Sequence, residues 1–529
     1  MNTAANVLRI LIIVLIGLVV VAILLMAAMV LIPSFALFGV KFVSYTGSSG
    51  DPDRKIDIIK DHESEWATTK TLVIETNGWG VEFRPYSNVG DSNYHISGQD
   101  NLRILFYAQY TGFVKVGEDG EERATCPNPV FGNHLDSGGA KACIISPKEP
   151  DAVWISKSSA KIVVLYDEGA LSNIDDIYIK TDSGSIYLGS TNMSENVRGD
   201  LDKKVTIVSK SGNITVGNID VSNSLKITKD SGDLNIKTNM TGNMTLSINA
   251  GYGTINVKDV GNPNAASNAK SVNFENIRNA NIQFGTIYGD LQYMTGNSGL
   301  VRGKKVTGSL IVNKTDSCTF KITEIGQDVN FNSDSGSLFA SYVGGNISQT
   351  NIKGNGQINV RALGGSSEIK SKNGKISLGE AFSGSANTGF VGVKGNVDIE
   401  TDSADIYVKC ADNVKLDLKS KNGYVKLENV MGTVNYSVVD GGKSGIKATY
   451  RELSGANTFT TNSGSVDIYI SVPANLTWQS ERSTEIEVSN LRTTEKTGSK
   501  AINGANGSSG SLTITTVAGK IKVKEPSTN

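Results

Sequence analysis

Apolar and polar residues alternate in a short phrase that recurs from residue 181 to the C-terminal region. Nine of its ten copies carry Gly at the fourth position, directly after Ser or Asn, and the tenth carries Ala404. Two and four residues later come apolar or small side chains, as at Ile186 and Leu188, with one residue between them. This period of two predicts short strands with one buried face, each preceded by a tight turn. The copies begin at Thr181, Ser209, Lys229, Ser333, Lys353, Ser371, Thr401, Ser420, Thr461 and Gly507.

The spacing of the phrase predicts the fold class. The turn glycines of neighbouring copies recur at nearly constant spacing, as from Gly212 to Gly232 and from Gly356 to Gly374. Such a repeat cannot close a core alone and buries its apolar face against its neighbours. We therefore expect an all-β protein, a single-stranded β-solenoid (β-helix) of about twenty-residue coils.

The N-terminal region has a different pattern. Every residue from Ile10 to Ile32 is apolar or Gly, a run of 23. A helix of this length crosses a hydrocarbon core of about 30 Å, whereas the apolar part of a cleaved signal has about 7 to 15 residues. The run predicts a retained single-pass transmembrane helix in the cell membrane. Arg9, just before it, favours a cytoplasmic N-terminus and an extracytoplasmic C-terminal part.

These patterns divide the chain into four parts. Residues 1–40 form the anchor, and residues 41–69 form a juxtamembrane linker. Residues 70–165 contain the first coils, interrupted at about 101–154 by a Cys-containing insertion that we expect to cap the solenoid. Residues 166–525 contain the repeats and a C-terminal cap. In that cap, lysines alternate with apolar residues before Pro526, which predicts a strand that blunts an exposed sheet edge.

The four cysteines suggest an oxidising exterior. Cys126 and Cys143 bracket a segment rich in Gly and Pro, and we expect them to form a disulfide. A zinc site is the alternative, but His134 is the only histidine between them. Cys318 and Cys410 are interpreted as small buried hydrophobes.

Composition and motifs argue against enzymatic chemistry. The chain has 51 basic and 52 acidic residues, so it lacks the positive surplus that nucleic-acid binding requires. Phosphate-binding loops, zinc-protease motifs and nucleophile elbows are absent from the sequence, and its three histidines all precede the repeats. We expect no catalytic residues, no cofactor, no metal and no nucleic-acid partner.

Aspartate recurs at the second position of the phrase, and three interpretations are open. The first is that these side chains accept hydrogen bonds from backbone amides at the turn. The second is calcium binding, and the third is glycoside hydrolysis by two carboxylates across a sugar. The residues concerned are Asp182, Asp230, Asp334 and Asp402.

Three aromatic residues occupy the outward slot between the two core positions of the phrase. They are Tyr187, Phe339 and Tyr407. Aromatic faces hold sugars and apolar patches, so these residues are the candidate ligand contacts. The alternative is that they are ordinary cross-strand fillers.

The order of these sequence features resembles that of a known family. The sequences VIETNGWGVEFRP and VVLYDEGALSNIDDIYIKTDSGSIYL, followed by repeated Ser-Gly-x-aliphatic-x-aliphatic coils, look like the "putative adhesin" family of bacterial membrane-anchored β-solenoid proteins, a domain of unknown function. The resemblance covers about residues 70–525, and the stretches 101–154 and 260–325 fit it poorly. It implies an extracytoplasmic solenoid and supplies no catalytic residues.

We therefore expect a non-enzymatic adhesin that contacts glycans, other envelope polymers or proteins of the cell surface. An envelope scaffold whose coils assemble with one another is the alternative. A polysaccharide-active β-helix enzyme is a third class, for which the four aspartates are the candidate residues.

Overall fold

The fold is described from a computed structural model of the chain. It divides into two compact units, Met1–Ile219 (unit 1) and Asp220–Asn529 (unit 2). The described residues are 2–31, 36–37, 40–48, 56–57, 66–86, 102–115, 129–135, 141–147, 152–167, 169–189, 199–240, 245–264, 271–352, 354–379, 392–409, 414–437, 445–482, 485–489, 491–506 and 509–524.

Unit 1 begins with one long apolar helix, α1 (Asn2–Leu31). Its most apolar stretch, Leu11–Ala28, has a mean hydropathy of 3.4, and none of that stretch is buried against the protein. Apolar side chains therefore face outward all around the helix, as expected when lipid is the solvent. The helix is long enough to cross a membrane, and an N-terminal helix of this kind serves as an anchor or as a signal sequence.

Two parallel ladders run through unit 1. One joins β8 (Lys141–Pro147), β4 (Thr69–Thr76), β10 (Asp176–Thr181) and β13 (Lys204–Ser209). The other joins β9 (Ala152–Tyr166), β5 (Gly80–Pro85), β11 (Ile186–Leu188) and β14 (Ile214–Val216). Each stretch of chain thus gives one strand to each ladder. The short strand β12 (Gly199–Leu201) lies outside both ladders, and β15 (Ile219–Val221) spans the boundary between the units.

Antiparallel strands complete unit 1 at the β8 and β9 side. β6 (Leu102–Lys115) pairs with β9, β2 (Val40–Ser48) and β3 (Ile56–Asp57), and β7 (Pro129–Leu135) pairs with β8. The two-residue strand β1 (Ala36–Leu37) pairs with β2. Part of the predicted insertion therefore belongs to the ladder, because β8 continues the parallel pairing with β4, whereas the start of β9 pairs antiparallel with β6. The antiparallel strands β6 and β7 are the part that departs from it.

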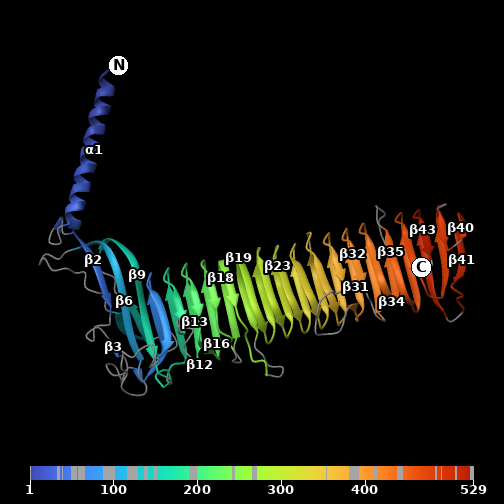
Figure 1. Cartoon of the computed structure of the whole chain (residues 1–529), viewed down its shortest axis with the longest axis horizontal. Coiled ribbons are helices and arrows are strands. Elements are labelled where there is room, and N and C mark those ends of the chain that lie inside the picture. Colours follow the sequence, from blue (N-terminus) through green and yellow to red (C-terminus); the bar gives the residue numbers. More distant parts are fainter. Residues whose placement is uncertain are drawn as a thin grey trace. The chain divides into compact units, whose positions relative to one another are not determined.

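Unit 2 contains the same two-ladder arrangement over a longer stretch of chain, and its strands lie side by side in chain order from β18 to β35 (Figure 1). The first ladder joins β16 (Ser224–Lys229), β18 (Thr245–Val257), β19 (Val272–Ile287), β20 (Leu291–Gly296), β22 (Leu310–Thr315), β24 (Val329–Ser333), β26 (Ile347–Ile352), β28 (Ser367–Ser371), β31 (Val397–Thr401), β33 (Val414–Ser420), β34 (Val425–Ser437) and β36 (Ala456–Thr461). The second joins β17 (Leu234–Ile236), β18, β19, β21 (Leu300–Val306), β23 (Thr319–Ile325), β25 (Ser337–Val343), β27 (Ile358–Leu363), β29 (Ile376–Leu378), β32 (Ile406–Lys409), β34, β35 (Ile446–Leu453) and β37 (Val466–Ile470). A two-residue strand, β30 (Gly392–Val393), also pairs with β27.

The core follows the predicted alternation. In β31 the side chain of Ile399 is fully buried, whereas its neighbours Asp398 and Glu400 are exposed. The poorly fitting stretch 260–325 keeps the same ladders, with aromatic rings in place of aliphatic side chains. Centroids of Phe274, Tyr293, Phe320 and Phe331 follow one another at 6.4, 5.1 and 5.5 Å.

Buried hydroxyl groups at the first position of the phrase hold the turn. The Oγ of Ser420 accepts a hydrogen bond of 2.8 Å from the N–H of Gly423, and Ser209 holds Gly212 in the same way at 3.0 Å. Both hydroxyls lie inside the protein. The same contact links Thr315 to Cys318 at 3.3 Å, which identifies a further copy of the phrase with Cys in place of Gly. The sequence Ser/Thr-x-x-Gly is therefore a turn in which a buried hydroxyl accepts a hydrogen bond from the glycine N–H.

The C-terminal strands do not form the edge of the sheet, and that prediction is wrong. β43 (Ile521–Lys524) lies between β37 and β39 (Ile486–Val488), while β42 (Gly510–Thr516) lies between β36 and β38 (Ala474–Ser480). Lys520 pairs with Glu485 at 2.9 Å, and Lys522 pairs with Glu487 at 3.4 Å. The alternating lysines serve these cross-strand ion pairs. The antiparallel strands β40 (Leu491–Thr493) and β41 (Thr497–Ile502) follow β39 and β38 at this end.

The inward hydroxyl predicts a measurable loss of stability. We expect Ser420→Ala to lower the free energy of unfolding by about 1 to 3 kcal/mol, because it leaves the buried N–H of Gly423 without its acceptor. Urea unfolding followed by circular dichroism measures the change. Ser403→Ala, at an exposed position of the neighbouring copy, is the matched control and should unfold like the unchanged protein. Equal midpoints for the two variants would contradict the structural role of the hydroxyl.

Candidate functional site

The parallel register places the outward slot of successive repeats in one continuous column of unit 2. Phe339 and Tyr407 belong to this column, three strands apart, with Asn359 and Ser377 between them. We call it the outward column, and its members are Asn235, Asn256, Gln283, Arg302, Lys321, Phe339, Asn359, Ser377, Tyr407, Lys426, Lys447, Asp467 and Lys522.

Lysines lie against both predicted aromatic rings of the outward column. The Nζ of Lys321 is 5.6 Å from the ring centroid of Phe339, and the Nζ of Lys375 is 4.3 Å from that of Tyr407. These distances are in the range of cation–π attraction. Basic side chains thus hold the two rings on the sheet surface. The sequence pattern alone did not predict these contacts.

Tyr407 lines a surface groove of about 390 Å³. Lys375, Lys409 and Lys426 also line it, with Glu428 as its acidic member. Glu428 accepts hydrogen bonds from Lys426 and from Lys409, the latter at 3.2 Å. The hydrogen bond from Lys426 is the main cause that lowers the pKa of Glu428, and burial opposes it. Three lysines against one glutamate make this groove a basic surface with an aromatic wall.

The third predicted aromatic, Tyr187, lies in unit 1. Its neighbours across the ladder are Glu82 of β5 and Thr215 of β14. The side chain is 38% exposed and lines a pocket of about 500 Å³. The structure thus places all three predicted aromatics on the outer surface, and two of them in hollows.

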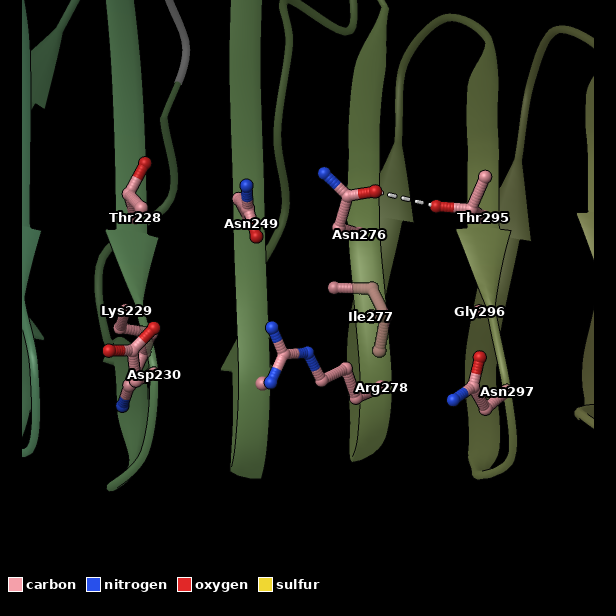
Figure 2. A pocket seen from close by; sticks show the side chains of 11 residues that line it. Thr228, Lys229, Asp230, Asn249, Asn276, Ile277, Arg278, Thr295, Gly296 and Asn297 are labelled. Carbon is pink, nitrogen blue, oxygen red and sulfur yellow. Dashed lines mark hydrogen bonds between the residues drawn. The ribbon is translucent and has the colours of Figure 1, made fainter.

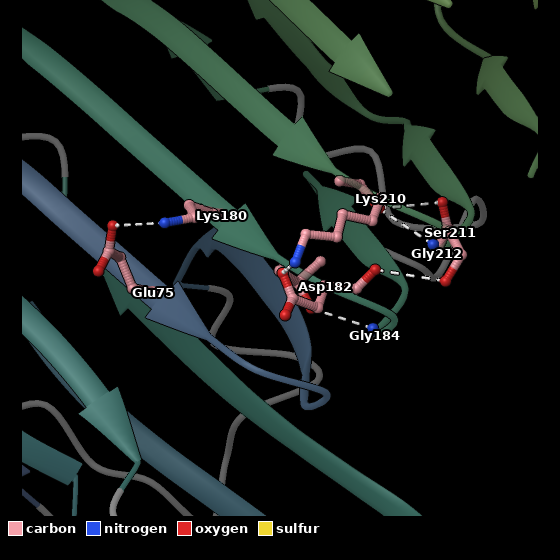
Figure 3. Close-up of polar contacts among 9 residues, drawn as sticks. Glu75, Lys180, Asp182, Gly184, Lys210, Ser211 and Gly212 are labelled. Atoms are coloured by element: carbon pink, nitrogen blue, oxygen red, sulfur yellow. Dashed lines mark hydrogen bonds and ion pairs between the residues drawn. The ribbon is translucent and has the colours of Figure 1, made fainter. Parts of the chain in front are cut away.

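Two of the four candidate aspartates form ion pairs along the turns. Asp182 pairs with Lys210, and Asp402 with Lys421, both at 2.9 Å (Figure 3 shows the first pair). Each lysine occupies the same position of the phrase in the next copy, so the contact ties successive repeats together. Such exposed pairs contribute up to about 1 kcal/mol.

The turn amides that those aspartates were expected to hold have other acceptors. In the copies of Asp182 and Asp334 the first-position hydroxyl accepts from the fourth-position N–H. Thr181 accepts from Gly184 at 3.0 Å, and Ser333 accepts from Gly336 at 2.5 Å. Carboxylates at other turn positions accept from the residue just before a strand of the next repeat, since Asp405 Oδ1 accepts from the N–H of Tyr424 at 3.0 Å. Asp328 Oδ1 accepts from the N–H of Asn346 at 2.7 Å. Aspartate therefore does cap backbone amides in this fold, at turn positions outside the set predicted from the phrase.

Lys229 is an exception to the turn rule. It stands where seven of the ten copies have Ser or Thr. The residue is 2% exposed, and its Nζ has no hydrogen-bond partner among the described residues. The next residue in that inward row is Ala250, whose small side chain leaves room for it. Burial lowers the pKa of Lys229 to about 8, partly offset by the charge of Asp233.

Lys229 also borders a polar hollow of about 410 Å³ on the surface of unit 2. Figure 2 shows the side chain of Arg278 pointing from its strand toward the neighbouring strand that carries Asn249. Asn276, in the same hollow, accepts a hydrogen bond of 2.8 Å from Thr295. Sequence reasoning missed this hollow because its residues come mostly from strands without the phrase.

The predicted cysteine roles have different outcomes. Cys318 is fully buried, 3.3 Å from the hydroxyl of Tyr293, which confirms it as a core residue. Cys143 is buried in β8, but Cys126 and Cys410 lie outside the described residues. The disulfide therefore stays a prediction. In the part of the chain that the structure describes, no three His, Cys, Asp or Glu side chains are grouped to hold a metal ion.

Comparison with known proteins finds one weak structural likeness. No family model matches the chain, and neither does any curated protein sequence. A crystal structure described as a putative cell adhesion protein from Clostridium sporogenes aligns with 91% of this chain and 100% of its own, at 9% identity and a TM-score of 0.16. That score is too low to establish a shared fold, so the family resemblance stays a prediction.

The buried amine of Lys229 predicts a pH-dependent gain on its removal. Because the folded pKa is lowered, the unfolded state binds more protons between about pH 8 and pH 10.5, and stability rises with pH through that window. We expect Lys229→Met, which keeps the volume without the charge, to stabilise the protein by up to about 3 kcal/mol at pH 7. The advantage should shrink as the pH approaches 10.5.

Thermal unfolding at pH 7 and pH 10 measures this gain. Lys226→Met, on the same strand but exposed, is the control and should leave the melting temperature unchanged at both pH values. A Lys229→Met variant that is less stable than the native protein at pH 7 would show that the amine makes a stabilising contact.

Proposed function

We propose that the protein is a non-enzymatic, membrane-anchored adhesin whose ladders form an extracytoplasmic β-solenoid. The main support for this proposal is the outward column. It aligns aromatic and basic side chains across many repeats, and its Tyr407 lies in a basic groove. Repeated, shallow and polar surfaces of this kind suit long polymers, which contact many repeats at once. The expected partners are polymers or proteins of cell surfaces and envelopes.

The register of the ladders supports the solenoid. Leu291 pairs with Leu310, Leu310 with Val329, and Val329 with Ile347, so each partner lies one repeat length further along the chain. Between two such residues the chain also gives a strand to the other ladder. A chain that returns to the same position with every repeat, always in parallel, describes successive coils.

The helix α1 supports the anchor. It has no polar face, and its apolar stretch exceeds the h-region expected of a cleaved signal. With the N-terminus in the cytoplasm, as Arg9 favours, the repeats would lie outside the cell membrane. This placement would give the outward column direct access to other surfaces.

A binding screen tests the proposal. The full chain, in a polyoxyethylene detergent that carries no sugar, is presented with envelope polysaccharides, glycans and whole cells, and reducing ends are assayed in the same wells. We expect saturable binding without new reducing ends. We also expect Tyr407→Ala to weaken binding of acidic polymers by about threefold or more, since it removes the aromatic wall of the groove.

The controls separate the three classes of function. Asp182→Asn and Asp402→Asn should bind like the unchanged protein, because in the described part of the chain each carboxylate pairs with a lysine at the turn. New reducing ends that disappear in either aspartate variant would overturn the proposal in favour of an enzyme. Absence of binding to every polymer and cell type would contradict the adhesin and favour a scaffold.

A further inference from the structure

Unit 1 has a hollow whose walls differ from those of the groove around Tyr407. It lies on the outward side of β5, β9 and β11 and has a volume of about 500 Å³. Tyr107 of β6 and Tyr187 of β11 both line it, although they are far apart in the sequence. Among the lining residues, Glu82 and Lys161 carry charge.

Glu82 is an outward residue that the fold nevertheless buries. Only 5% of it is exposed, and its two carboxylate oxygens accept hydrogen bonds from different partners. Oε1 accepts from the Nε–H of Arg84 at 2.8 Å, and Oε2 accepts from the Nζ of Lys161 at 3.0 Å. The carboxylate is thereby fixed in orientation, while each oxygen keeps a lone pair for a further donor.

The two tyrosines are held in different ways. Tyr107 packs on the apolar cluster of Leu105, Val163 and Leu165, and the Nζ of Lys161 lies 5.3 Å from its ring centroid. It is therefore a rigid wall. Tyr187 is the more exposed ring and offers a face to a ligand.

Three glycines, Gly78, Gly80 and Gly184, contribute backbone without side chains to the lining of the hollow. A Cβ at Gly184 would lie 1.9 Å from the carbonyl oxygen of Trp79, so the close approach of two repeats excludes any side chain there. Part of the wall is therefore bare backbone, and Ser185 adds a hydroxyl to the lining.

We propose that this hollow binds a neutral pyranose sugar, stacked on Tyr187, with vicinal hydroxyls that donate to Glu82. The chemistry matches because the C–H face of a pyranose packs on an aromatic ring and its hydroxyls hydrogen-bond to a fixed carboxylate. We expect the sugar to be neutral because the two charged groups that line the hollow, Glu82 and Lys161, pair with each other, while Arg84, which holds the other carboxylate oxygen, is not among the lining residues. This inference rests on the proposed adhesin function and names a ligand class for unit 1.

Titration with simple sugars tests the site. The full chain in sugar-free detergent is titrated with methyl glucopyranoside, methyl galactopyranoside and methyl mannopyranoside, followed by saturation-transfer NMR, with methyl glucuronide as the charged comparison. We expect at least one neutral sugar to bind saturably and more tightly than the glucuronide. Tyr187→Ala and Glu82→Gln should each weaken binding about tenfold.

Matched variants separate loss of the stacking face from general damage to the protein. Tyr187→Phe preserves the stacking face and should bind within about threefold of the unchanged protein. Tyr252→Ala, which removes an exposed ring of unit 2 outside both the hollow and the groove around Tyr407, should leave sugar binding unchanged. If Glu82→Gln fails to fold, the exposed Tyr187→Ala carries the test, because it removes only a surface ring.

Three results would overturn the inference: no saturable binding of any neutral sugar, preference for the glucuronide, or binding that Tyr187→Ala leaves intact. Each differs from failure of the proposed function, which is measured with polymers and cells. If the protein binds polymers but none of the neutral sugars, the sugar site in unit 1 is refuted and the proposed adhesin function is not.

Discussion

The parallel hydrogen-bond ladder between successive repeats is the constraint on which the rest of this structure depends. A single repeat offers short strands with one apolar face, which is too little to be stable alone. Pairing with the repeats before and after covers that face and satisfies the backbone. The Ser/Thr hydroxyl at the turn does the same for the bend, since it accepts from an amide that the ladder leaves inside.

The ladder also decides what the surface can do. Along the second ladder of unit 2 the pairing stays continuous at the outward slot, although bulges shift the register elsewhere, so outward side chains of successive repeats form a column. In unit 2 this places Lys321 beside Phe339 and Lys426 beside Tyr407. In unit 1 the antiparallel strand β6 adds Tyr107 beside the outward residues of the ladder, where a flat column becomes a hollow with a buried carboxylate.

Some residues depart from the repeated phrase, and there the packing of the core differs from that of the other copies. Lys229 replaces a hydroxyl with a buried amine that makes no hydrogen bond in the described structure, at a cost to stability that the rest of unit 2 tolerates. Cys318 replaces the turn glycine, and the neighbouring Tyr293 places its hydroxyl against the sulfur. The stretch 260–325 was a poor fit to the phrase because rings fill its core, although its backbone continues the same ladders.

Local alternation was enough to predict the strands that carry the phrase and their inward and outward faces, and the apolar run was enough to predict the helix, because each of these depends on residues close together in the sequence. Tertiary structure alone decided which strands became neighbours. The C-terminal strand β43 matches the edge pattern in sequence yet lies between β37 and β39, and Lys375 reaches the ring of Tyr407 from another repeat. Tyr107, Glu82 and Tyr187 meet for the same reason: long-range register, which a local pattern does not encode, brings their strands together.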